Sequence, residues 1–96
     1  MNNNKQAYFK TIDLSEQKSI SSKKLKDIIT STIKWHICGL EEASSIDGVE
    51  LYHNKAYELL LFGRSNLGLY SDDEYNYIYD KIWKATEKRI RGLQND

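Results

Sequence analysis

The residues best suited to binding chemistry form a stripe in the C-terminal quarter of the chain. Four cations and one tyrosine recur there at intervals of three and four residues, the spacing that places side chains on one face of a helix. They are Tyr77, Lys81, Lys84, Lys88 and Arg91. Such a ladder can contact phosphates or an acidic protein groove, while the tyrosine stacks on a base or fills a pocket. We therefore take these five as the candidate partner-binding residues.

The same stripe has a simpler explanation as a solvated helix face. Asp80 precedes Lys84 by four residues, and Glu87 precedes Arg91 by four, so each acid can pair along the helix with its cation. Nucleic acid is the alternative partner. Against it, the stripe consists mainly of flexible lysines without the Asn or Gln neighbours that read bases, and no helix-turn-helix pattern is present.

The histidines and the single cysteine do not form a metal set. His36 and Cys38 are two residues apart and point to different faces of a helix, and His53 has no partner at ligand spacing. His36 falls on an apolar face, which is typical of a buried, hydrogen-bonded histidine; a pH-sensitive or ligand-facing imidazole is the alternative. Cys38 leans toward the polar side, as an accessible thiol would. We expect neither a metal nor a cofactor.

Most carboxylates have a structural explanation at helix starts. Asp47 with Glu50, and Ser71 with Glu74, match the capping box, in which the first residue caps the helix and the glutamate bonds back to it. The chain has no phosphate-binding glycine loop, nucleophile elbow or kinase-type signature. The sequence therefore predicts no catalytic residues and a protein that is not an enzyme.

Three helices must position these side chains, and apolar spacing places them at about residues 22–44, 48–62 and 72–92. Ser21 or Ser22 caps the first, and Gly63 ends the second as a left-handed residue. The short connections predict a small all-α bundle in one domain over residues 1–96. Residues 1–6 are expected to fray, and residues 7–20 to form an arm or a short extra element.

The helix faces predict the core and one further surface. The expected core face of the first helix contains Leu25, Ile28, Ile29, Thr32, His36, Gly39, Leu40 and Ala43. On the second helix, Leu51, Leu61 and Phe62 interrupt the polar side and could form an apolar interface or a homodimer seam. Arg89 falls inside the apolar arc of the third helix. It should extend along the core edge or meet Glu41, Glu42 or Glu58.

The composition narrows the class of protein. The chain has 96 residues, a net charge of zero and one cysteine, and no run of residues is apolar enough to span a bilayer. A reducing cytoplasm is the expected compartment, with no membrane insertion. A high lysine-to-arginine ratio and many Ile, Asn and Tyr residues suggest an AT-rich genome. We expect a small interaction protein, such as a phage- or mobile-element-encoded inhibitor or an intracellular immunity protein, whose partner is another protein.

Overall fold

The computed structural model describes residues 21–95, which form three helices joined by two short connections. The helices are α2 (Ser22–Glu42), α3 (Ile46–Ser65) and α4 (Asp72–Asn95), and this part of the chain contains no strand. The predicted small all-α bundle is confirmed. The arm or extra element expected at residues 7–20, and the frayed end at 1–6, lie outside the described residues.

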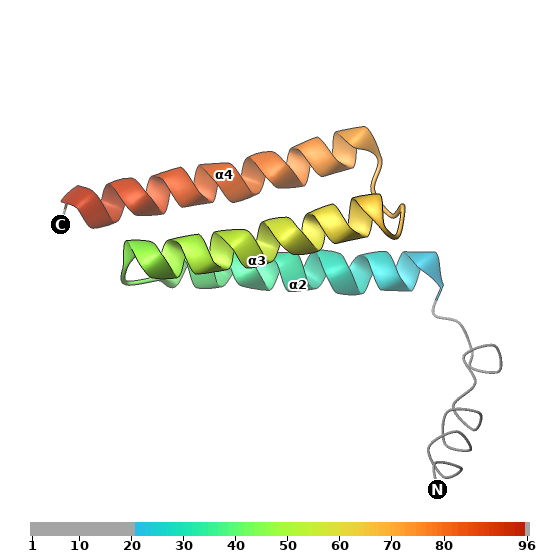
Figure 1. Ribbon diagram of the computed structural model, residues 1–96, viewed down its shortest axis with the longest axis horizontal. Coiled ribbons are helices and arrows are strands. Elements are labelled where there is room, and N and C mark those ends of the chain that lie inside the picture. Colours follow the sequence, from blue (N-terminus) through green and yellow to red (C-terminus); the bar gives the residue numbers. More distant parts are fainter. Residues whose placement is uncertain (1–20, 96) are drawn as a thin grey trace, which may run out of the picture.

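The three helices run up, down and up (Figure 1). α3 lies antiparallel to both neighbours and packs against each, whereas α2 and α4 run in the same direction and make the least extensive contact of the three pairs. The short connections explain why consecutive helices are antiparallel. A connection of a few residues is long enough only to turn the chain back alongside the helix that precedes it. One long boundary, between α2 and α4, is therefore only partly filled by the bundle itself.

Serine residues cap the starts of all three helices. The Ser21 hydroxyl accepts a hydrogen bond from the Lys24 amide at 3.1 Å. Ser71 and Glu74 form the predicted capping box: the Ser71 amide donates to the Glu74 carboxylate at 2.9 Å, and the Glu74 amide donates to the Ser71 hydroxyl at 3.1 Å. That prediction is confirmed in both of its bonds.

The other predicted capping box is wrong. Ser45, not Asp47, caps α3, with its hydroxyl accepting from the Gly48 amide at 3.1 Å. The residue three positions after this cap is Gly48, which has no side chain to bond back, so a capping box cannot form there. Asp47 lies in the first turn, where its charge still complements the helix dipole.

The glycine expected to end α3 lies inside the helix. Gly63 is buried, and a Cβ atom built on it would lie 2.8 Å from the Tyr70 ring. α3 continues two residues further to Ser65, and the left-handed backbone belongs to Gly68, with φ of 61°. Gly63 is thus explained by the close approach of an aromatic ring and not by a helix end.

The core contains aliphatic side chains from all three helices. The buried hydrophobic residues are Ile29, Ile33, Leu40, Val49, Ala56, Leu60, Tyr70 and Ile82. The predicted face of α2 was rotated away from the true one: Ile28 is 47% exposed, while Ile33 is 1% exposed and Ile37 packs against the core. The predicted face of α2 is the side that packs against α3. In the structure α2 also contacts α4, and Ile33 and Ile37 lie on that side.

Candidate functional site

The predicted stripe lies along one wall of a groove between α2 and α4. The groove has a volume of about 610 Å³, within the range of ordinary binding pockets. We call it the α2–α4 groove; it is lined from α2 by Thr30, Ile33, Lys34, Ile37, Cys38 and Glu41, and from α4 by Tyr77, Ile78, Lys81, Lys84, Ala85 and Lys88. Four of the five predicted partner-binding residues are therefore brought together with residues of another helix.

Arg91 is the one predicted partner-binding residue that does not line the groove. It is exposed to solvent. The reason is the length of α2, which ends at Glu42: Arg89 already reaches Ala43, the next residue, so Arg91 lies beyond the end of that wall. Helical spacing predicts that the stripe lies roughly opposite the apolar arc of the same helix. In the structure it instead flanks that arc, because Ile78 and Ala85 line the groove together with Tyr77 and the lysines.

The groove combines an apolar floor with a positive rim. Ile33, Ile37, Ile78 and Ala85 supply the aliphatic surface, and no sequence pattern on one helix alone marks them as a set. The rim carries four lysines against one acid, Glu41. The excess of lysines gives the groove a positive potential, which attracts an acidic ligand more strongly at low salt.

Two of the lysines have neighbours that hold them in place. The Nζ atom of Lys84 lies 2.9 Å from the Asp80 carboxylate, the predicted i,i+4 pair, and this bond raises the pKa of Lys84 above its usual value of 10.5. The Nζ atom of Lys81 lies 5.3 Å from the centroid of the Tyr77 ring, a cation–π contact. The second predicted pair, Glu87 with Arg91, does not form an ion pair in the described structure. Tyr77 remains 64% exposed at the head of the groove.

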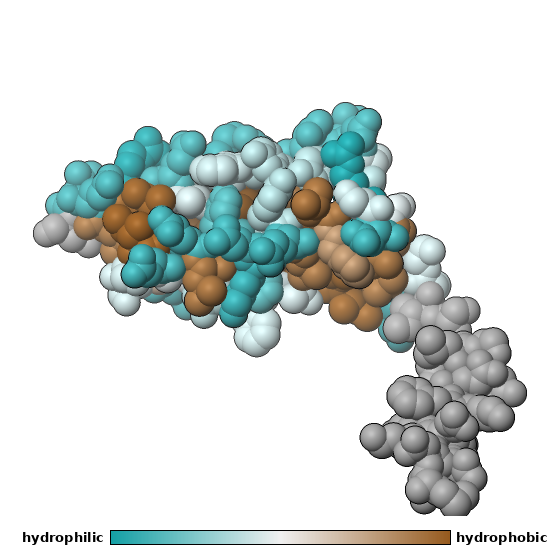
Figure 2. Space-filling model, in the orientation of Figure 1, coloured by the Kyte–Doolittle hydropathy of each residue, from teal (hydrophilic) through white to brown (hydrophobic). Residues whose placement is uncertain are grey.

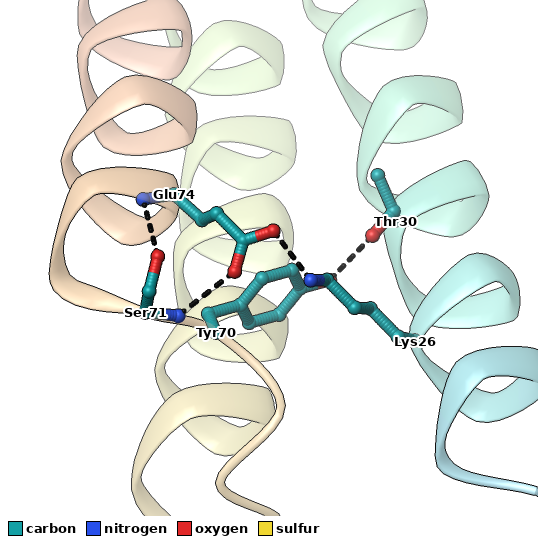
Figure 3. Close-up of polar contacts among 5 residues, drawn as sticks. All are labelled: Lys26, Thr30, Tyr70, Ser71 and Glu74. Atoms are coloured by element: carbon teal, nitrogen blue, oxygen red, sulfur yellow. Dashed lines mark hydrogen bonds and ion pairs between the residues drawn. The ribbon is translucent and has the colours of Figure 1, made fainter.

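A set of polar contacts fastens α2 to the start of α4 at one end of the groove (Figure 3). Lys26 forms an ion pair with Glu74, and the Tyr70 hydroxyl lies 2.7 Å from the Thr30 hydroxyl. We call Lys26, Thr30, Tyr70, Ser71 and Glu74 the clasp. The bond from Lys26, and then the Ser71 amide, lower the pKa of Glu74 from 4.5 to about 2. The clasp fixes the spacing of the two groove walls at this end.

Arg89 makes the corresponding contact at the other end. Its Nε atom donates to the carbonyl oxygen of Ala43 at 2.8 Å, and the side chain is half-buried. Of the two alternatives for Arg89, an acidic partner does not occur among residues 21–95; the guanidinium instead bonds to the backbone carbonyl that follows the last turn of α2. The two walls are therefore tied at both ends and separated between them.

The histidines lie outside the groove. The Nδ1 atom of His53 is 2.8 Å from the Thr86 hydroxyl, which itself donates to the Ile82 carbonyl. Since that hydroxyl has a single proton, His53 must donate through Nδ1, and burial lowers its pKa below the usual 6.5. His36 is half-buried, with its ring centroid 6.4 Å from that of Tyr52. Within residues 21–95 the His36 ring makes no hydrogen bond, so the predicted partner of this histidine is not found in that part of the chain.

A small hollow beside His53 is the nearest approach to a catalytic arrangement. It has a volume of about 230 Å³ and is lined by Glu50, His53, Asn54, Trp83 and Thr86. The Trp83 ring packs edge-on at 4.6 Å between centroids. Thr86 is buried, and its hydroxyl donates a hydrogen bond to a backbone carbonyl, so it is not available as a nucleophile. The sequence analysis missed this contact, although helical spacing puts Thr86 within the apolar arc of α4 and could have indicated a buried hydroxyl.

Cys38 is exposed, in agreement with the predicted accessible thiol, and it lies on the margin of the α2–α4 groove. No group of three or more potential metal ligands occurs within residues 21–95. Among the described helices, none combines the length and the apolar character that crossing a membrane requires.

The predicted apolar interface is exposed but discontinuous. Leu51, Leu61 and Phe62 are 52%, 40% and 47% exposed. Leu51 and Phe62 are separated by about three helical turns, and Leu61 points about 100° away from Phe62. Figure 2 shows hydrophobic surface toward both ends of the molecule with a hydrophilic band between. Trp35, which no sequence pattern singled out, is the most exposed large hydrophobic residue among residues 21–95, at 77%.

Comparisons with known proteins leave the site to be interpreted from its own geometry. No protein-family model, curated protein or solved structure matches this chain.

Proposed function

We propose that this chain is a non-enzymatic interaction protein that binds another protein through the α2–α4 groove. The observation that carries the proposal is that Tyr77, Lys81, Lys84 and Lys88 border an apolar hollow together with residues of α2. A solvated helix face would have only water beside it. An inhibitor or an immunity protein works in this way, by occupying a surface of its target.

Binding is better supported than catalysis because the groove lacks paired reactive groups. Its titratable side chains are four lysines, Glu41, Cys38 and Tyr77. A general acid–base mechanism needs a base within hydrogen-bond reach of a nucleophile or of its substrate. His53 does not line the groove but borders a separate hollow of about 230 Å³, which is smaller than a typical ligand site.

A protein partner is better supported than nucleic acid because of the groove floor. Phosphates are recognised by cations and amides, and bases by stacking or by hydrogen bonds to their edges. Here the lysines border aliphatic side chains, chiefly Ile33, Ile37 and Ile78, and one face of Tyr77 is already engaged by Lys81. Apolar surface inside a polar rim is the arrangement of a protein interface.

Site-specific photo-crosslinking in the native host tests the proposal. The photoreactive residue p-benzoylphenylalanine replaces Tyr77 in one variant and Trp35 in the other. Both side chains are exposed and aromatic, but Trp35 does not line the groove. We expect irradiation to link one protein to the Tyr77 variant and not to the Trp35 variant. Adding Lys84→Glu and Lys88→Glu should remove the link.

The outcomes separate the alternatives. A crosslink only at Trp35 would move the interface to the outer face of α2. A crosslink at Tyr77 to nucleic acid would replace a protein partner with the second candidate. If neither position captures a macromolecule under conditions where the protein is folded and expressed, the proposal of a groove-based binding protein is wrong.

A further inference from the structure

The α2–α4 groove lies where a fourth helix of a bundle would pack, between two parallel helices. α2 and α4 run parallel and are tied together at their ends by the clasp and by the bond from Arg89 to Ala43. Between these ties the floor is aliphatic and open. α3 runs antiparallel to both helices (Figure 1), packs against each of them and contributes no residue to the lining of the groove. An added antiparallel helix would complete a four-helix bundle with up-down topology.

We infer that the groove binds an acidic amphipathic helix of a partner protein, which lies antiparallel to α2 and α4. This inference rests on the proposed function and names the chemistry of the partner. It commits to a helix because the floor is a row of aliphatic side chains contributed by two helices, the surface into which an amphipathic helix lays its apolar face.

The rim specifies where the acids of the partner should lie. Lys81, Lys84 and Lys88 follow one wall at helical spacing, and Lys34 stands on the other wall. Acidic residues on both flanks of an apolar stripe would therefore each meet a lysine. Counting Glu41 on the rim and Asp80 beside Lys84, the lysines remain in excess, so charge favours a negative ligand.

The dimensions of the groove set the length of the partner helix. From Tyr77 to Lys88 the α4 wall extends about 16 Å, at about 1.5 Å per residue. A helix of three to four turns, or about 12 to 15 residues, would span the lining residues. Its apolar residues should recur at a and d positions of a heptad to reach Ile33, Ile37, Ile78 and Ala85.

A pair of synthetic peptides tests this chemistry on the full-length protein. One is a capped helical peptide of about 16 residues with leucine at a and d and glutamate on both flanks; the other has lysine in place of each glutamate. Binding is followed by the amide NMR signals of the labelled protein. We expect the glutamate peptide to shift signals of Ile33, Ile78 and Ala85, and to bind at least about tenfold more tightly than the lysine peptide at low salt.

Charge reversal supplies the matched control. Lys84→Glu with Lys88→Glu should abolish the preference for the glutamate peptide or invert it. Lys24→Glu with Lys55→Glu changes the net charge equally, at exposed lysines that do not line the groove, and should keep the preference. The amide spectrum of each variant without peptide establishes that it is folded.

Several results would overturn the inference. Equal binding of the two peptides, or shifts confined to residues such as Trp35 and Phe62, would reject an acidic helix in this groove. Tighter binding of a single-stranded oligothymidylate to the same residues would assign the groove to nucleic acid. Self-association that is lost on reversal of Lys84 and Lys88 would assign it to a second copy of the chain, and a crosslink from residues 1–20 to Lys84 would assign it to the chain's own N-terminal segment.

This experiment and the photo-crosslinking fail independently. If the peptides do not bind but Tyr77 still crosslinks to a protein in the host, the groove is an interface and only the assigned chemistry is wrong. If the peptide binds but no protein is captured at Tyr77, the chemistry is right for the groove and the proposed function is wrong.

Discussion

At the scale of single residues, Gly63 leaves room for the ring of Tyr70 to pack closely against α3. The Tyr70 ring is 7% exposed and its hydroxyl is held by Thr30, so the ring cannot move aside easily. A methyl group at position 63 would meet two ring carbons, at 2.8 and 3.3 Å. The glycine is required by this packing although it sits in the interior of a helix, where glycine is normally unfavourable.

Gly63→Ala should therefore destabilise the fold. Overpacking costs about 1–3 kcal/mol, and the better helix propensity of alanine recovers up to about 1 kcal/mol, so we expect a net loss of about 1–2 kcal/mol in the free energy of unfolding. Chemical denaturation measures it. Gly92→Ala is the control, because nothing lies within 4 Å of its added Cβ, and it should be neutral or mildly stabilising. Equal stability of the two variants would contradict the assigned packing.

Glu74 makes the stability of the bundle depend on pH in the acid range. Its pKa is lowered from 4.5 to about 2, first by the bond from Lys26 and then by the Ser71 amide. The unfolded chain therefore takes up a proton at higher pH than the folded chain. The stabilisation is complete above about pH 4.5 and is lost as the pH falls toward 2.

Glu74→Gln should weaken this acid dependence. Thermal unfolding between pH 6 and 2.5 would show a smaller fall in Tm for the variant than for the wild-type protein, because the variant has no carboxylate to protonate at this position. Glu87→Gln serves as the control, since Glu87 is exposed and outside the clasp. Identical pH profiles for Glu74→Gln and the wild type would show that the ionised Glu74 carboxylate contributes nothing to stability.

At the scale of elements, the clasp attaches α2 to the residues that precede α4. Tyr70 belongs to the connection, not to a helix, yet it is buried and bonds to Thr30 on α2. The contact therefore joins elements 40 residues apart in the chain. It also explains why Thr30, which helical spacing places on the polar side of α2, is half-buried.

Tyr70→Phe removes the hydroxyl and keeps the ring. We expect a loss of about 1 kcal/mol in the free energy of unfolding, the usual net contribution of one hydrogen bond. A double-mutant cycle with Thr30→Val measures the coupling directly. The double variant should lose about as much free energy of unfolding as either single variant loses alone. If its loss instead equals the sum of the two single losses, the hydroxyls do not interact in solution.

The secondary structure was largely predictable, and its details were lost where tertiary contacts intervened. The three helices start within two residues of their predicted positions, because serine caps and apolar periodicity are local signals. The predicted end of α3 is too early because glycine often terminates helices, whereas Gly63 makes room for the Tyr70 ring inside the helix. Ser45 and Asp47 are both suitable N-cap residues, and the conformation of the connecting turn, which is not a local sequence signal, places Ser45 in that position.

At the scale of the whole molecule, the lysines that border the α2–α4 groove lie apart from the core that maintains the fold, although Ile33 on the groove floor belongs to that core. These lysines are exposed, whereas the core consists of buried side chains from all three helices and the two ties join α2 to the start of α4 and to Arg89. Binding and stability should therefore respond to different substitutions. Such separation is typical of surface charges, most of which change stability by little.

Lys84→Glu combined with Lys88→Glu should change the free energy of unfolding by about 1 kcal/mol or less. The largest expected loss comes from the ion pair of Lys84 with Asp80, which is exposed to solvent. Equilibrium denaturation checks this alongside the peptide titrations. A loss of about 3 kcal/mol or more would mean that these lysines serve the fold, and would remove the basis for their use as binding variants.

The sequence alone determined the helical class, the cap of α4 and the membership of Tyr77, Lys81, Lys84 and Lys88 on one helix face. These features depend on residues within one or two turns of each other, whose spacing is visible in the chain. Only the tertiary structure decided that this face borders Ile33 and Ile37 across a groove, and that Arg91 lies beyond it. Those relations join residues 40 or more positions apart, and they follow from how α2 and α4 pack on α3, which no local pattern encodes.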